Sequence, residues 1–252
     1  MPNGLNFEGR VAIVTGGAGG IGLAVGRRFA AGGAHVVLVD ARQDAVAEAA
    51  GALRDLGRQA TGLCADVSNA AAVEALIDTT LARTGCIDVL VNNAGIMGRV
   101  APLWELSLDE WHQVLAIDLT SVFLMSRAVV PHMRTRRSGS IVSVASIAGK
   151  EGTPNLIPYS VAKAGIIAFT KALGKEVVAD GIRVNCVAPG VIATPLLDQL
   201  PETATQIMLS KAPMGRFGTA DEVAAVVQFL ASDDASFVTS QCFDASGGRA
   251  TY

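Results

Sequence analysis

Short apolar runs alternate with longer helical segments along most of this chain of 252 residues. The runs are continuous stretches of Val, Ile, Leu and Ala, a pattern typical of parallel strands that are covered on both faces. Strands and helices that alternate in this way require right-handed crossovers, which build a doubly wound sheet. The expected strands are 10–15, 34–39, 59–64, 87–91, 139–144, 182–187 and 241–243, and the expected helices are 20–31, an Ala-rich segment ending near 56, 70–83, 108–134, 159–178 and 220–230.

The composition is that of a globular α/β protein. Half of the residues are apolar, 27 are Gly and only 17% are charged, which is atypical of disordered or coiled-coil chains. The sequence contains neither an internal repeat nor a linker rich in Pro, Ser or charge. We therefore predict one domain over residues 1–252, a Rossmann-type fold with a mostly parallel sheet of seven strands.

Charge and hydropathy argue against several functional classes. The formal net charge is −3, with acidic and basic residues interspersed, so neither nucleic acid nor a membrane surface is an expected partner. The first residues lack the charged and apolar regions of a secretory signal. No apolar run is expected to reach membrane-spanning length, and a cytoplasmic location is expected.

The cysteines and histidines show no spacing typical of metal ligands. We therefore predict no metal site, and we interpret the cysteines as buried thiols in a reducing cytoplasm. The four cysteines are Cys64, Cys86, Cys186 and Cys242.

A glycine-rich turn follows the first expected strand and opens the first expected helix. Its sequence, Thr-Gly-Gly-Ala-Gly-Gly-Ile-Gly, covers residues 15–22. Glycines let the backbone turn tightly and approach a pyrophosphate, while the helix N-terminus supplies unpaired N–H groups and positive potential. A flexible turn is the alternative, but the strand before and the helix after match a dinucleotide-binding context. The expected cofactor contacts are Gly16, Gly20, Ile21 and Gly22.

An acidic residue ends the second expected strand. Asp40 follows Gly22 by eighteen residues, and a carboxylate there accepts hydrogen bonds from both ribose hydroxyls and repels a 2′-phosphate. The glycine turn contains neither Lys nor Arg, and we interpret the nearby Arg42 as solvated. The sequence therefore favours NAD over NADP.

Two further strand ends carry polar residues at the edge where such sheets bind ligands. Asp66 and Val67 follow the third strand, where the carboxylate is placed to contact an adenine amino group; a helix N-cap is an almost equally good interpretation. Asn93 lies in the Asn-Asn-Ala-Gly sequence of residues 92–95 after the fourth strand. A plain turn is the alternative there, since Asn and Gly favour turns in any protein.

A phenol and an ammonium group lie one helical turn apart in the sequence Tyr159-Ser-Val-Ala-Lys163. Positions i and i+4 share a helix face. A cation beside a phenol stabilises the phenolate, which lowers a pKa of roughly 10 toward the range useful for proton transfer. Ser146 precedes Tyr159 by thirteen residues, at the end of an apolar strand. Most isolated pairs of this kind are surface residues, and the cofactor motifs before it favour a catalytic role here.

Taken together, these segments resemble the short-chain dehydrogenase/reductase family. The matching pieces are residues 15–22, 66–67, 92–95, 146, 159–163 and 183–195, which span nearly the whole chain. The resemblance implies that Tyr159 is the general acid/base, that Lys163 binds the nicotinamide ribose, and that Ser146 holds the substrate oxygen. It also implies assembly as a homotetramer, and contacts to the nicotinamide carboxamide from Pro189, Gly190, Ile192 and Thr194.

Two residues depart from the family pattern. Asp118 stands in the long helix where the family commonly has an Asn as its fourth catalytic residue. An ionised Asp accepts hydrogen bonds but cannot donate them, so we expect activity to survive with an altered pH dependence. Ser240 stands where Gly is usual, and we attach little functional weight to it.

The expected substrate is a small polyhydroxylated molecule, namely a sugar, sugar acid or polyol. The polar loop before Tyr159 and the resemblance of the last residues to sugar- and polyol-oxidising family members favour this class. Asn155 is an expected substrate contact, and Arg99 or Arg249 could pair with an anionic group, although a surface position is the simpler interpretation of both arginines.

Two other functions compete with this one. A 3-oxoacyl thioester reductase normally prefers NADPH, which the carboxylate of Asp40 disfavours. A nucleotide-sensing scaffold without turnover has no need of an intact set of Ser146, Tyr159 and Lys163.

Overall fold

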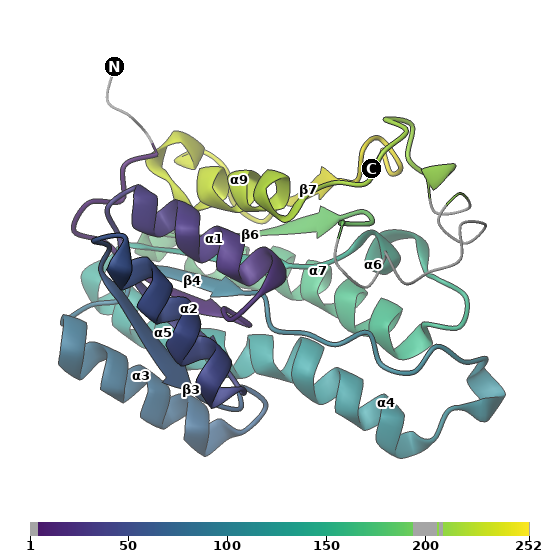
Figure 1. Cartoon of the computed structure of the whole chain (residues 1–252), viewed down its shortest axis with the longest axis horizontal. Coiled ribbons are helices and arrows are strands. Elements are labelled where there is room, and N and C mark those ends of the chain that lie inside the picture. Colours follow the sequence, from purple (N-terminus) through teal and green to yellow (C-terminus); the bar gives the residue numbers. More distant parts are fainter. Residues whose placement is uncertain (1–4, 194–205, 207–208, 252) are drawn as a thin grey trace.

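Seven parallel strands form the central sheet of the computed structural model, which describes residues 5–193, 206 and 209–251 (Figure 1). Their order is β3-β2-β1-β4-β5-β6-β7, and all six neighbouring pairs are parallel. The expected doubly wound sheet is confirmed, and it is wholly rather than mostly parallel among the described strands. The strands are β1 (Val11–Thr15), β2 (His35–Asp40), β3 (Ala60–Cys64), β4 (Val89–Asn92), β5 (Gly139–Val144), β6 (Ile182–Pro189) and β7 (Cys242–Ala245).

Helices cover both faces of the sheet (Figure 1). Successive strand residues point to opposite faces, so Val14 and Leu38 enter one apolar cluster while Ile13 and Val37 enter another. This double burial explains why the strand sequences are continuously apolar. The first cluster packs under α1 (Gly20–Ala31), α2 (Gln43–Asp55) and α9 (Ala220–Ala231), and the second under α3 (Ala70–Thr84), α5 (Ser121–Arg136) and α7 (Ile157–Val177).

The helix expected over 108–134 is interrupted by one wide turn. It consists of α4 (Leu108–Leu115), the π-helical segment η2 (Ala116–Thr120) and α5. Ser107 and Glu110 form a capping box that starts α4. Single π turns inside α-helices occur frequently at functional sites, and this one contains the fully buried Asp118.

By length and composition, the continuous stretch Leu108–Arg136 is a candidate for crossing a membrane. This corrects the expectation that no apolar run reaches that length. The stretch contacts α3 and α7 within the fold. Helices that pack inside a domain meet the same criterion, so the finding is weak support for a membrane location.

Several short elements escape sequence periodicity because they span too few residues to show it. The most important is α6 (Ile147–Glu151), which follows β5 directly. The others are the 3₁₀ turns η1 (Leu103–Glu105), η3 (Val178–Asp180) and η5 (Asp233–Ala235).

Ser240 occupies a backbone position that suits glycine. Its φ of 61° lies in the left-handed region, which costs residues with a Cβ roughly 1–2 kcal/mol. Its buried hydroxyl oxygen has no hydrogen-bond partner among the described residues. The departure from Gly therefore bears on stability.

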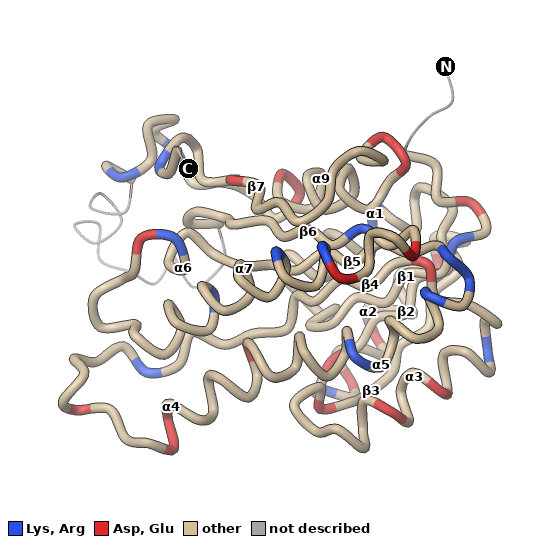
Figure 2. Tube along the Cα trace, turned by 180° about the vertical axis from the view of Figure 1, so that it is seen from behind, with Lys and Arg blue, Asp and Glu red and all other residues tan. Residues whose placement is uncertain are grey.

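Acidic and basic residues are interspersed along the described trace (Figure 2). Some of them join distant elements, as where Arg134 at the end of α5 pairs with Asp180 of η3 at 2.6 Å. Neighbouring residues of opposite charge also lie at the end of α6, where Lys150 is followed by Glu151.

Candidate active site

The carboxyl ends of β1 to β4 border a cavity of about 480 Å³. Gly19 also lines this cavity and directly precedes Gly20, Ile21 and Gly22, the first turn of α1. The fold thus brings together four segments that are far apart in the sequence. The predicted cofactor residues that line the cavity are Gly16, Asp40, Asp66, Val67 and Asn93.

The glycine turn fits a pyrophosphate at the start of α1. A Cβ on Gly22 would lie 2.2 Å from the carbonyl oxygen of Gly16, so only glycine permits this close approach of helix and turn. Around Gly19 and Gly20, by contrast, the position of a Cβ is open space. The first turn of α1 has neither a side-chain cap nor an acidic residue, so its N–H groups and positive dipole end are available to an anion.

Asp40 ends β2 at the cavity and is already paired. Its Oδ1 accepts hydrogen bonds from the backbone N–H (3.1 Å) and Nε (3.0 Å) of Arg42, and its Oδ2 accepts one from the Ala18 N–H (3.2 Å). Burial alone would raise the pKa of Asp40, but these hydrogen bonds hold it below its ordinary value. The interpretation of Arg42 as solvated is therefore only half right, because its side chain is 68% exposed yet paired. Exposed pairs contribute about 0–1 kcal/mol, so ribose hydroxyls can replace the guanidinium at little cost.

Asn93 ties the end of β4 to the glycine turn. Its Nδ2 donates to the carbonyl oxygens of Thr15 (2.9 Å) and Gly16 (3.2 Å). The Thr15 hydroxyl oxygen accepts the N–H groups of Asn93 (2.9 Å) and Ala94 (3.1 Å). Asn93 is thus more than a turn former, because it holds one wall of the cavity in place.

Asp66 is not the cap of the following helix. Its Oδ1 accepts hydrogen bonds from the N–H (2.9 Å) and hydroxyl (2.6 Å) of Ser68. The N-cap of α3 is Asn69, whose side chain accepts from the Ala72 N–H. The capping interpretation of Asp66 is therefore wrong, and its carboxylate is exposed at the cavity.

Lys163 of α7 connects three elements at the ends of the strands. Its Nζ lies 5.4 Å from the centroid of the Tyr159 ring and donates to the Val144 carbonyl oxygen at the end of β5 (3.1 Å). It also lies 3.2 Å from Oδ2 of Asp118. The side chains of Lys163 and Asp118 are 5% and 0% exposed, so this ion pair is buried.

Asp118 is the counter-ion of Lys163, an arrangement that the sequence did not predict. Its Oδ1 accepts the Ile96 N–H at 2.7 Å. Burial raises the pKa of Asp118, while the Lys163 charge and the Ile96 hydrogen bond oppose that rise. Gly95 leaves room for the pair, because a Cβ there would lie 2.8 Å from Asp118 Oδ2 and 3.2 Å from Lys163 Nζ.

Ser146 follows β5 and caps α6. Its Oγ accepts the Ala148 N–H at 3.1 Å, and the residue is buried. A hydroxyl that accepts one hydrogen bond still has its own proton to donate. The loop that orients Ser146 thus leaves it able to donate to a substrate oxygen.

Three predicted substrate residues make contacts within the chain. Arg99 is half exposed and pairs with Glu105 (3.5 Å), as expected of a surface arginine. Arg249 pairs with Glu151 at 2.7 Å and its side chain is only 15% exposed, so it is neither a free surface arginine nor a free anion partner. Asn155 is exposed, and its carbonyl oxygen accepts the Ala101 N–H (3.0 Å).

The segment predicted to contact the nicotinamide carboxamide follows β6. Pro189 is the last residue of that strand, and the Gly190 N–H donates to the Ala245 carbonyl oxygen (3.1 Å). Ile192 lines a second cavity of about 310 Å³ rather than the 480 Å³ one. Thr194 lies outside the described residues.

Sequence reasoning missed several site residues, three of which have a clear part in the site. Thr15 holds Asn93, Ile117 lines the 480 Å³ cavity, and Gly95 makes room for the Lys163–Asp118 pair. Thr15 opens the glycine-rich sequence of residues 15–22, which does not indicate a contact with Asn93, and Ile117 is a helix residue with no distinguishing local signal. Gly95 had a signal, because it belongs to the Asn-Asn-Ala-Gly sequence, but its partners lie in other elements.

The described residues contain no cluster of three or more His, Cys, Asp or Glu that could hold a metal ion. The four cysteines are free, and only Cys186 is buried, while Cys64 is exposed. The expectation of four buried thiols is therefore wrong.

Comparison with known proteins places this arrangement among oxidoreductases. Residues 16–250 match a family described as enoyl-(acyl carrier protein) reductase. A 2-dehydro-3-deoxy-L-rhamnonate dehydrogenase (NAD(+)) from Sphingomonas sp. (strain SKA58) is 45% identical, over 98% of this chain and 97% of the relative. A 3-oxoacyl-[acyl-carrier-protein] reductase from Thermotoga maritima is 40% identical, over 97% and 99%. The crystal structure of an NAD⁺-bound xylitol dehydrogenase superposes with a TM-score of 0.93 at 34% identity, over 96% of this chain and 99% of that one.

Proposed function

The chain belongs to the short-chain dehydrogenase/reductase family, and we propose that it is an NAD-dependent dehydrogenase that interconverts a secondary alcohol and the matching carbonyl. The observation that carries the proposal is the buried ammonium of Lys163, 5.4 Å from the centroid of the Tyr159 ring. Together with Ser146, this pair supplies the groups that removal of a hydroxyl proton requires.

The chain's own residues handle the proton and the oxygen. During oxidation the Tyr159 phenolate takes the hydroxyl proton as the C–H bond breaks and the hydrogen departs with its electron pair. Lys163 stabilises the phenolate by its charge, and Ser146 donates a hydrogen bond to the substrate oxygen as that oxygen becomes negative. Bound NAD supplies the hydride acceptor. In the reverse direction Tyr159 returns the proton to the oxygen of the reduced carbonyl.

We assign the cofactor to the 480 Å³ cavity. The first turn of α1 holds the pyrophosphate, and Asp40 accepts the ribose hydroxyls once the exposed Arg42 guanidinium moves aside. Asp66, which is exposed at this cavity, is the proposed contact of the adenine amino group. Pro189, Gly190, Ile192 and Thr194 remain the proposed contacts of the carboxamide. The relative from Sphingomonas, whose name includes NAD(+), supports this cofactor.

The proposed substrate class is a sugar, sugar acid or polyol. The names of the Sphingomonas relative and of the xylitol dehydrogenase support this class. The exposed Asn155, in the loop between α6 and α7, also suits a polar substrate better than a long acyl chain.

A 3-oxoacyl thioester reductase is the second candidate. The Thermotoga relative favours it, at 40% identity over nearly the full length of both chains. Asp40 argues against it, because a carboxylate at this position repels the 2′-phosphate of NADPH. The two functions therefore differ in both cofactor and substrate.

We also propose a homotetramer in the cytoplasm. Large apolar side chains on two helices support the assembly, since Phe123 of α5 is 46% exposed and Val161 of α7 is 42% exposed. A second subunit packed on these two helices would remove both side chains from water. Light scattering of the purified protein tests this, and a monomer at micromolar concentration would contradict it.

One experiment tests the activity. Purified protein is assayed with NAD and with NADP against a panel of sugars, sugar acids, polyols and 3-hydroxyacyl thioesters. We expect NAD-dependent oxidation of a member of the polar class, and a loss of about 10³-fold or more in Tyr159→Phe with NADH binding retained. Tyr252→Phe is the matched control, because residue 252 is the only other tyrosine. Oxidation of the 3-hydroxyacyl thioesters alone, with NADP as the hydride acceptor, would overturn the proposal.

A further inference from the structure

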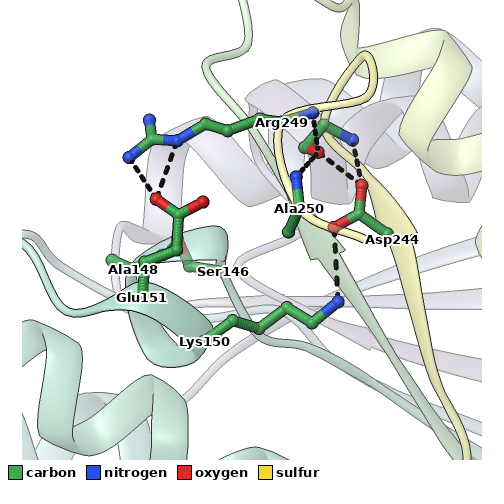
Figure 3. Close-up of polar contacts among 8 residues, drawn as sticks. Ser146, Ala148, Lys150, Glu151, Asp244, Arg249 and Ala250 are labelled. Carbon is green, nitrogen blue, oxygen red and sulfur yellow. Dashed lines mark hydrogen bonds and ion pairs between the residues drawn. The ribbon is translucent and has the colours of Figure 1, made fainter. Parts of the chain in front are cut away.

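α6, the helix that Ser146 caps, is held at its C-terminal end by residues in and after β7 (Figure 3). α6 has only five residues, too few to be stable as an isolated helix. Its last two side chains are both paired. Lys150 Nζ lies 3.4 Å from Asp244 Oδ2, and Glu151 Oε2 accepts Nη2 (2.7 Å) and Nε (3.0 Å) of Arg249.

These contacts are better shielded from water than ordinary surface pairs. The side chains of Lys150 and Asp244 are 7% and 24% exposed and those of Arg249 and Glu151 are 15% and 29% exposed, against 51% for both members of the Arg99–Glu105 pair. Shielded pairs are screened less by salt and hold their geometry better. Lys150 and Glu151 are neighbours of opposite charge, so α6 can pair with both Asp244 and Arg249 in only one position along its axis.

Residues 244–250 are folded so that both charges face α6. The Ser246 hydroxyl donates to Asp244 Oδ1, and its oxygen accepts the N–H groups of Arg249 (3.1 Å) and Ala250 (3.2 Å). Gly247 and Gly248, with φ of 68° and 89°, turn the chain back on itself. The backbone at Arg249 is therefore held in place independently of its contact with Glu151.

α6 also lies directly against the helix that carries Tyr159 and Lys163. A Cβ on Gly149 would lie 2.5 Å from the backbone carbonyl carbon of Lys163, so no side chain separates the two helices there. A shift of α6 would therefore change the position of Ser146 relative to Tyr159.

We propose that residues 244–250 form a clamp on α6, in which Arg249 and Glu151 are a positioning pair that fixes the Ser146 hydroxyl for catalysis. The proposal rests on the proposed dehydrogenase function. Arg249 then acts through Glu151 and makes no contact with substrate. Loss of the pair lowers kcat roughly 10- to 100-fold, because displacement of a catalytic group by about 1 Å costs up to about 10² in rate. KM changes less than about twofold, because the Ser146 hydrogen bond strengthens mainly in the transition state.

The test compares Arg249→Gln, Glu151→Gln and the double variant by steady-state kinetics and by hydrogen–deuterium exchange of residues 146–152. We expect each single variant to lose kcat and to exchange faster in that segment. The double variant should be no worse than the poorer single variant, since both changes break one contact. Arg249→Lys should restore part of the rate. The control is Arg134→Gln with Asp180→Asn, a pair of similar length (2.6 Å) between α5 and η3, which should leave both measurements unchanged.

Two results would overturn the clamp. One is a rise in KM for anionic substrates in Arg249→Gln while Glu151→Gln stays normal, because Arg249 would then bind substrate directly. The other is unchanged exchange of residues 146–152 in both single variants. The exchange measurement requires no turnover, so a failure of every substrate in the panel would count against the dehydrogenase proposal and leave the clamp open to test.

Discussion

Replacing Asp118 with Asn removes one negative charge from beside Lys163 while keeping the shape of the side chain. Asp118 Oδ2 lies 3.2 Å from Lys163 Nζ, which lies 5.4 Å from the centroid of the Tyr159 ring. The carboxylate oxygen is therefore no more than about 9 Å from that centroid. At that distance, and at an effective dielectric constant of about 20, one negative charge destabilises a phenolate by about 2 kcal/mol. Since about 1.4 kcal/mol corresponds to one pH unit, half-maximal oxidation should occur about one pH unit lower in the variant.

The assay is kcat/KM for oxidation as a function of pH, from about pH 5 to about pH 11, for both proteins. The acidic limb should move toward lower pH in Asp118→Asn, with a plateau of similar height. Burial raises the pKa of Asp118, so on acidification the wild-type carboxylate loses its charge earlier than an ordinary one, and the two profiles should converge at low pH. Asp180→Asn removes the same charge far from the site and should not move the limb. An unmoved limb in Asp118→Asn, or one moved to higher pH, would refute the reasoning.

Two further predictions concern the cofactor and the stability of the fold. In Asp40→Ala, the Arg42 guanidinium loses its partner and becomes available to a 2′-phosphate. The ratio of kcat/KM for NADP to kcat/KM for NAD should therefore rise about 10- to 100-fold. This rise should vanish when Arg42→Ala is added, and a rise that persists in the double variant would contradict the assignment of Asp40. Ser240→Gly removes a Ser in the left-handed region and a buried hydroxyl that has no partner among the described residues, so the free energy of unfolding in urea should rise by about 1 kcal/mol after the entropic cost of Gly. Asn155→Gly is the control, because Asn tolerates its similar φ of 64°, and it should raise the free energy of unfolding by less. Equal increases in the two variants would mean that backbone conformation alone is responsible.

The sequence predicts what local pattern determines. Each strand was expected within about two residues of its observed bounds, because continuous apolar runs reflect burial on both faces. The glycine turn, Asp40 and the Tyr159–Lys163 spacing could also be recognised from the sequence, because each depends on a single strand, turn or helix.

The contacts that were not predicted join residues far apart in the chain. The Asp118–Lys163 pair depends on the π turn in the long helix and on the depth at which α7 packs, neither of which has a local signature. The Arg249–Glu151 pair joins the last residues to a five-residue helix. Arg42 was misjudged because the geometry of the turn after β2, not its composition, brings the guanidinium back to Asp40.

The missing side chain at Gly95 has a consequence for redesign of this enzyme. Position 118 can exchange a carboxylate for an amide of nearly the same size, so the charge beside Lys163 is adjustable. Position 95 offers no such freedom, because even a methyl group would lie 2.8 Å from Asp118 Oδ2, which would have to shift, and in tight contact with Lys163 Nζ at 3.2 Å. Engineering of the pH optimum should therefore vary residue 118 and leave residue 95 untouched.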